Sequence, residues 1–76
     1  MEVYPNPVAN TINVERRGSS DANAIVQVTD VSGRVLRSVS VTEDKTTIDL
    51  SGLSSGVYLI RYSDNSHQQT FKINKL

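Results

Sequence analysis

The stretch that decides the fold is Ser51–Ser63, which reads SGLSSGVYLIRYS. Its second half, Val57 to Ser63, is rich in β-branched and aromatic residues and begins apolar on both faces, which is typical of a central strand between two covered surfaces. Its first half is a connection of glycine, serine and one leucine. Because a wholly polar loop would not contain Leu53, we expect this side chain to fold back onto the end of the core. The stretch therefore predicts a central strand that follows a turn whose Leu53 side chain covers the end of the core.

The rest of the chain repeats the pattern of strand and turn in both directions. Apolar and polar residues alternate with a period of two, and glycine, asparagine, aspartate or serine separates one segment from the next. The seven predicted strands are Glu2–Tyr4, Thr11–Arg17, Ala24–Asp30, Arg34–Val41, Thr46–Leu50, Val57–Ser63 and Gln69–Lys75. We expect an all-β fold of two antiparallel sheets packed face to face, since each strand has one apolar side to bury. A small closed barrel is the alternative, which the shortness of the strands disfavours.

The hairpin around the turn DVSGR has specific expectations. Gly33 is expected to adopt positive φ, as a bulged hairpin requires. Val35, Val39 and Val41 share one phase of the returning strand and are expected to face the core. Arg37 interrupts that apolar face, which predicts an edge strand or a side chain that snorkels to solvent.

The composition limits the chain to one small domain, residues 2–76. Its 76 residues bury only about 60% of the surface they would expose unfolded, and without cysteine neither a disulfide nor a cysteine metal site can reinforce them. Eight basic and eight acidic residues cancel, so the charge gives no reason to expect nucleic acid or an anionic membrane. The adjacent Arg16 and Arg17 are interpreted as a solvated strand end. No apolar run approaches the roughly 20 residues of a membrane helix, and MEVYPNP lacks the regions of a signal peptide.

The sequence lacks the groupings on which catalysis depends. The single histidine, His67, lies in a predicted turn where neither a pocket nor a buried carboxylate partner is expected. The aspartates are scattered over separate turns without the spacing of a calcium loop, and no glycine-rich phosphate loop is present. We therefore predict neither an enzyme nor a cofactor or metal site.

Two motifs that contain tyrosine have structural interpretations. Tyr58 follows Gly56 by two residues, in the place of a tyrosine corner, whose hydroxyl bonds back to the preceding loop. In YPNP, Pro5 and Pro7 favour a stiff, extended lead-in to the sandwich. Asn6 between them can form a turn with its own backbone.

The ordered blocks VYPNPV, TINV, VTDVSGRVL, IDLSGLSSGVYLIRY and FKINKL resemble the type A C-terminal sorting domain of the Bacteroidetes type IX secretion system. The resemblance covers Val3 to Lys75, and its specificity lies in the ordered set, because each block alone is weak. It implies a seven-stranded immunoglobulin-like β-sandwich that acts as the secretion signal of its parent protein. It also implies transit through the periplasm, recognition by the outer-membrane translocon and its shuttle proteins, and arrival at the cell surface or outside. In many members a sortase-type cysteine protease then removes the domain and attaches the cargo to lipopolysaccharide.

The resemblance extends to individual residues. The matching positions are Tyr4, Pro5, Asn6, Pro7, Gly33, Leu50, Leu53, Gly56, Tyr58, Lys72 and Lys75. Two features depart from the family pattern. The turn DNSH has no glycine, so Asn65 is expected to adopt the left-handed conformation in its place. Leu76 follows the closing lysine as an additional apolar residue.

The last predicted strand, Gln69–Lys75, is the expected recognition element. We predict that it lies at a free sheet edge, to which a partner can add a strand. Lys72 and Lys75 would add positive charge there and oppose self-association. The alternative function is a non-catalytic extracellular spacer or a carbohydrate-binding module, although a sugar platform needs exposed aromatic residues, of which there are few. Under the sorting interpretation, the cut lies in the chain before Val3.

Overall fold

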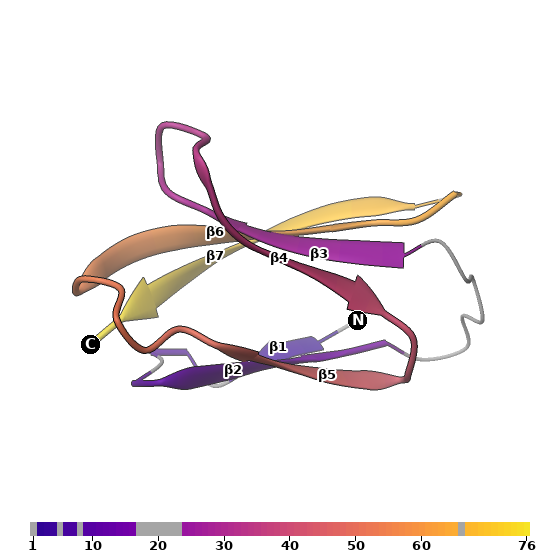
Figure 1. Ribbon diagram of the computed structural model, residues 1–76, viewed down its shortest axis with the longest axis horizontal. Helices are drawn as coiled ribbons and strands as arrows, with labels where there is room; N and C mark the ends of the chain where they lie inside the picture. Colours follow the sequence, from indigo (N-terminus) through magenta and orange to yellow (C-terminus); the bar gives the residue numbers. More distant parts are fainter. Residues whose placement is uncertain (1, 5, 8, 17–23, 66) are drawn as a thin grey trace.

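The computed structural model describes residues 2–4, 6–7, 9–16, 24–65 and 67–76. They form two antiparallel sheets that face each other (Figure 1), as predicted. One sheet has the order β1-β2-β5, with the bounds Glu2–Tyr4, Thr11–Glu15 and Lys45–Asp49. The other has the order β4-β3-β6-β7, with the bounds Val35–Val41, Ala24–Thr29, Gly56–Ser63 and Gln68–Lys75. The described strands remain in two separate sheets, so the barrel alternative is not supported. The predicted bounds differ from these by at most two residues.

β6 lies between β3 and β7 and pairs with both, which confirms the predicted central strand. Tyr58, Ile60 and Tyr62 are buried between the sheets. The prediction that both faces of this strand are covered is wrong, because Val57 on the opposite face is 38% exposed. An antiparallel sheet in a two-layer fold has one face against the core and one in water. The apolar residues of the outer face are therefore not a sign of a second covering layer.

The core is one cluster of aliphatic and aromatic side chains between the sheets. Its buried members are Ile12, Val14, Ala24, Val26, Val28, Val41, Ile48, Leu50, Tyr58, Ile60, Tyr62 and Ile73. Burying one such aliphatic side chain stabilises a fold by about 1.5–3 kcal/mol. Leu53 packs against the cluster from the turn before β6, as predicted. Because the chain has no cysteine, no disulfide can join the two sheets, and the packing of this core holds them together.

A bulge in β4 changes the phase of the hairpin strand. Val28 is opposite Arg37, but the next residue, Thr29, is opposite Val35, so Leu36 is the additional residue. Leu36 packs against the core and Val35 is 48% exposed. The prediction that Val35 faces the core is therefore wrong, because an inserted residue reverses the alternation that precedes it.

Candidate functional site

β7 forms an edge of the four-stranded sheet, with β6 as its neighbour (Figure 1), so the predicted edge position is confirmed. Phe71 and Ile73 pack toward the core, whereas Lys72 and Asn74 are exposed. This alternation follows from the pleat of a strand with one buried face. The side of β7 that faces away from β6 is the candidate recognition site.

The free edge is interrupted by the side chain of Asn6, which the sequence does not predict. The Asn6 carboxamide donates from Nδ2 to the backbone oxygen of Lys72 over 3.4 Å and accepts at Oδ1 from the backbone N–H of Asn74 over 3.0 Å. The peptide bond between Asn6 and Pro7 is cis. The interpretation of YPNP as only a stiff lead-in is therefore incomplete, because Asn6 contacts the far end of the sequence. Pro5 lies outside the described residues.

A hollow of about 340 Å³ lies beside this contact. It is lined by Asn6, Val57, Lys72, Ile73 and Asn74. The lining combines apolar carbon, amide groups and one exposed ammonium group, which suits a peptide with an apolar side chain better than a small charged metabolite.

Tyr4 fixes the strand that leads to Asn6. Its hydroxyl donates to Glu15 Oε2 over 2.8 Å, and the Lys45 ammonium lies 6.0 Å from the centre of its ring. The hydrogen bond to the Glu15 carboxylate raises the pKa of Tyr4 above its ordinary value of 10.0. β1, β2 and β5 are thus joined by one side-chain cluster, and this cluster anchors the chain just before the Asn6 contact.

The turn before β6 has the predicted tyrosine corner. The Tyr58 hydroxyl donates to the backbone oxygen of Ser54 over 2.6 Å. Leu53 N–H bonds to the oxygen of Leu50, which is itself fully buried. Gly56 has φ of 151°, a backbone conformation that residues with a Cβ rarely adopt. Leu50, Leu53, Gly56 and Tyr58 therefore form a structural unit that sets the start of β6.

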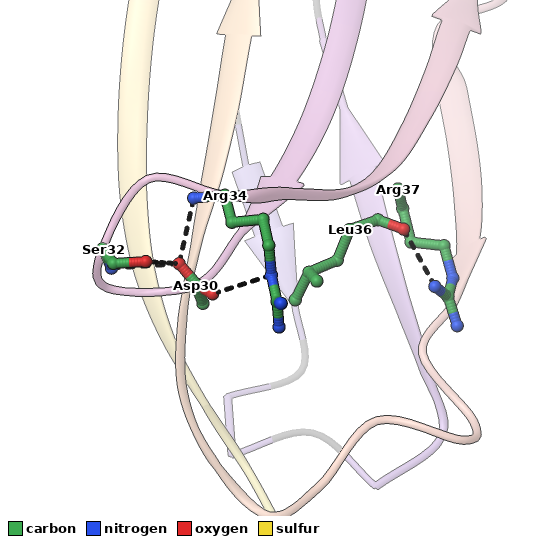
Figure 2. Close-up of polar contacts among 5 residues, drawn as sticks. All are labelled: Asp30, Ser32, Arg34, Leu36 and Arg37. Carbon is green, nitrogen blue, oxygen red and sulfur yellow. Dashed lines mark hydrogen bonds and ion pairs between the residues drawn. The ribbon is translucent and has the colours of Figure 1, made fainter.

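The hairpin turn around Gly33 is organised by Asp30 (Figure 2). Asp30 Oδ1 accepts from the N–H and hydroxyl of Ser32 and from the N–H of Arg34, and its other oxygen lies 3.3 Å from Arg34 Nε. The Ser32 and Arg34 hydrogen bonds hold the pKa of Asp30 below its ordinary value of 3.8. Gly33 has φ of 97°, which confirms the predicted conformation.

Arg37 connects the edge strand β4 to the opposite sheet. Its guanidinium donates to the backbone oxygens of Leu36 (2.9 Å, Figure 2), Ser51 (3.3 Å) and Asp49 (3.4 Å). β4 is an edge strand, as the interruption of its apolar face predicts. Ser51 lowers the pKa of the Asp49 carboxyl through its side chain and its N–H, the latter bonding to Asp49 Oδ1. The Arg37 guanidinium thus links β4 to the end of β5 and to the start of the turn that contains the tyrosine corner.

Tyr62 lies in a buried polar network that is not predicted from the sequence. Arg16 is only 6% exposed, and its Nη1 donates to the Tyr62 hydroxyl over 3.3 Å. That hydroxyl donates to Asp64 Oδ2 over 2.7 Å, and the Asp64 side chain is 2% exposed. The prediction that Arg16 is a solvated strand end is wrong; Arg17 lies outside the described residues. The missed signal is the phase of Arg16, which continues the inward alternation of Ile12 and Val14.

The closing lysine is also placed differently from the prediction. Lys75 is only 8% exposed, and its Nζ lies 3.4 Å from the backbone oxygen of Leu76. It continues the inward phase of Phe71 and Ile73, so its stem is covered while Lys72 remains in solvent. Of the two lysines predicted to charge the free edge, the structure places only Lys72 on an exposed position.

The last hairpin is set by Asp64 and not by Asn65. No described non-glycine residue has positive φ, so the predicted left-handed conformation of Asn65 is wrong. Instead the Asp64 N–H bonds to the oxygen of His67, and the His67 N–H bonds back to Asp64 Oδ1. The Asp64 carboxylate, which accepts a backbone N–H within the turn, therefore organises this hairpin.

Neither a cluster of metal-ligating side chains nor an exposed aromatic surface is found among the described residues. Within them, no group of three histidine, cysteine, aspartate or glutamate side chains could hold a metal ion. All four aromatic side chains are buried or half-buried, which argues against a sugar-binding platform. In the part of the chain that is described, no helix is long and apolar enough to span a membrane.

The chain matches the model of a known protein family. The family model described as "Secretion system C-terminal sorting domain" matches residues 2–75. No curated protein matches the chain. The matched range runs from β1 to the last residue of β7 and so includes both sides of the Asn6 contact.

Proposed function

The chain belongs to the secretion system C-terminal sorting domains of the type IX secretion system, and from this premise we propose how its fold carries the signal. Members of this family are sorting signals and not catalysts, and they direct export to the cell surface or secretion through interaction with the secretion machinery. The proposal is that residues 2–76 form a single seven-stranded immunoglobulin-like domain whose β7 edge the machinery reads. Its parent crosses the periplasm before the outer-membrane translocon and its shuttle proteins bind this edge.

The observation that carries the proposal is the position of β7. Its side away from β6 has backbone donors and acceptors, and Lys72 is exposed beside the hollow. A strand added at such an edge gains affinity from main-chain hydrogen bonds, so it can read cargoes of many kinds through one shared feature. A strand that pairs along the whole edge displaces Asn6, whose two hydrogen bonds are each worth about 0.5–1.5 kcal/mol. A continuous ladder exceeds this cost.

The remaining motif residues have supporting roles in this proposal. Asn6 holds the chain against the β7 edge, and Tyr4 anchors the strand before it. Gly33, Leu50, Leu53, Gly56 and Tyr58 maintain the two turns, and Lys72 and Lys75 belong to the strand that is read. A sortase-type cysteine protease then cuts the chain before Val3 and attaches the cargo to lipopolysaccharide. The tight contacts of Tyr4 and Asn6 support a boundary that lies upstream of them.

A reporter fusion tests this function. Residues 2–76 are fused to the end of a periplasmic reporter in a host with a working type IX system and in the same host without its translocon. We expect surface or extracellular reporter only in the first host, and loss of export when residues 71–76 are deleted. Export without the translocon, or full export after the deletion, would contradict the proposal.

A further inference from the structure

The backbone groups that Asn6 occupies are those that any added strand would use. Lys72 O and Asn74 N–H face away from β6 and flank Ile73. In a ladder, parallel or antiparallel, a neighbouring strand hydrogen-bonds to both of these groups. One carboxamide here supplies the donor and the acceptor that a peptide would supply.

The two-residue repeat of the strand fixes which other groups face outward. Gln68 and Thr70 share the phase of Lys72 and Asn74, so their backbone groups also point away from β6. Among the described residues, β7 has no second strand as a neighbour. Its eight residues form a long edge, of the kind that pairs with another chain unless something prevents it.

We propose that Asn6 prevents a second copy of this chain from pairing along β7. An antiparallel pair of β7 strands centred on Phe71 would place Thr70 opposite Lys72 and Gln68 opposite Asn74, with no like charges opposed. Centred on Thr70, the pair would place Lys72 opposite Gln68. Both registers need Lys72 O, and Asn6 holds this group.

The Asn6 contact opposes the pairing of two copies more strongly than the addition of one strand from another protein. A two-fold pair must displace Asn6 in both copies, whereas a partner strand of another protein displaces it once. The third register, centred on Lys72, opposes two ammonium groups and is disfavoured by charge. This inference concerns the isolated chain, so it does not depend on the proposed function.

Sedimentation equilibrium of the purified chain tests the inference. The matched control for Asn6→Ala is Asn13→Ala, which removes an exposed side-chain hydrogen bond of similar length, from Thr47 Oγ1, in the other sheet. We expect Asn6→Ala to self-associate at least about tenfold more tightly than the wild type, and Asn13→Ala to remain like the wild type. Equal self-association of the two variants would overturn the inference.

Two further variants locate the surface through which the copies associate and keep the test valid if Asn6→Ala does not fold. Adding Thr70→Pro to Asn6→Ala removes an outward N–H of β7 and is expected to abolish the gained association; association that persists would place it elsewhere and overturn the inference. Asn6→Asp keeps the acceptor for Asn74 N–H but cannot donate to Lys72 O, so it is expected to associate more tightly than wild type even if Asn6→Ala does not fold. Association of Asn6→Asp no tighter than wild type would contradict the role of the carboxamide.

Discussion

Replacing Tyr62 by phenylalanine removes one hydroxyl that connects two nearly buried charged groups. This hydroxyl accepts from Arg16 Nη1 and donates to Asp64 Oδ2. A hydrogen bond to a charged group contributes about 1.5–3 kcal/mol, against about 1 kcal/mol for a neutral pair. We therefore expect Tyr62→Phe to lower the free energy of unfolding by about 2–3 kcal/mol, a large part of the roughly 4–11 kcal/mol expected for a chain of this length.

Tyr58→Phe is the matched control, because it removes a hydroxyl from the same face of the same strand. Tyr58 donates to a neutral carbonyl, Ser54 O, so the expected loss is about 1 kcal/mol. At about 4–8 °C per kcal/mol for a domain of this size, the Tm should fall by roughly 8–24 °C in Tyr62→Phe and by roughly 4–8 °C in Tyr58→Phe.

Urea unfolding and thermal scans of both variants measure the difference. A loss in Tyr62→Phe no larger than in Tyr58→Phe would refute the claim that Arg16 and Asp64 depend on this hydroxyl. A double-mutant cycle of Arg16→Met with Tyr62→Phe isolates the pair, and we expect a coupling of at least about 0.5 kcal/mol. If the losses of the two single variants simply add up in the double variant, the claim would also be refuted.

Four further substitutions test the core, a turn and the acid response. Ile60→Ala should cost about 2–5 kcal/mol in urea unfolding, since Ile60 is fully buried, whereas Val57→Ala on the outer face should cost less than about 1 kcal/mol; equal losses would contradict the one-sided burial of β6. Gly33→Ala should cost about 1–2 kcal/mol because φ is 97° there, and an unchanged unfolding midpoint would contradict this. The pKa of Asp30 is lowered by Ser32 and Arg34, so its stabilisation is complete above the ordinary value of 3.8 and is lost as pH falls through the lower folded-state value. Asp30→Asn should therefore flatten the acid limb of a plot of urea midpoint against pH, and a limb as steep as in the wild type would count against it.

The strands and most of the core could be predicted because alternation is local. Ile12, Val14, Ile48 and Leu50 are buried where the period of two places them. The tyrosine corner could also be predicted, since the donor Tyr58 and its acceptor Ser54 belong to one turn. At these residues the local pattern and the final structure agree, because the groups involved are near in sequence.

Three physical causes explain the errors at Val35, at Arg16 and Lys75, and at Asn6. An inserted residue in β4 exposes Val35, and nothing in the composition of that strand marks the insertion. Arg16 and Lys75 were assigned to solvent by residue type, although their phase is that of the buried face and their long stems suit it. The Asn6 contact joins opposite ends of the sequence, so no local pattern indicates which acceptor its side chain reaches.

The central claim is that the secretion machinery reads the outward edge of β7, and Thr70→Pro tests it most directly. Proline removes the outward N–H of Thr70 and is tolerated at an edge where that N–H faces solvent, while Thr70→Ala changes only the side chain. Both variants of the reporter fusion are first shown to be folded by circular dichroism, and extracellular reporter is then measured in the type IX-competent host. The account predicts normal export for Thr70→Ala and loss of export for Thr70→Pro. Equal export of the two folded variants would contradict it.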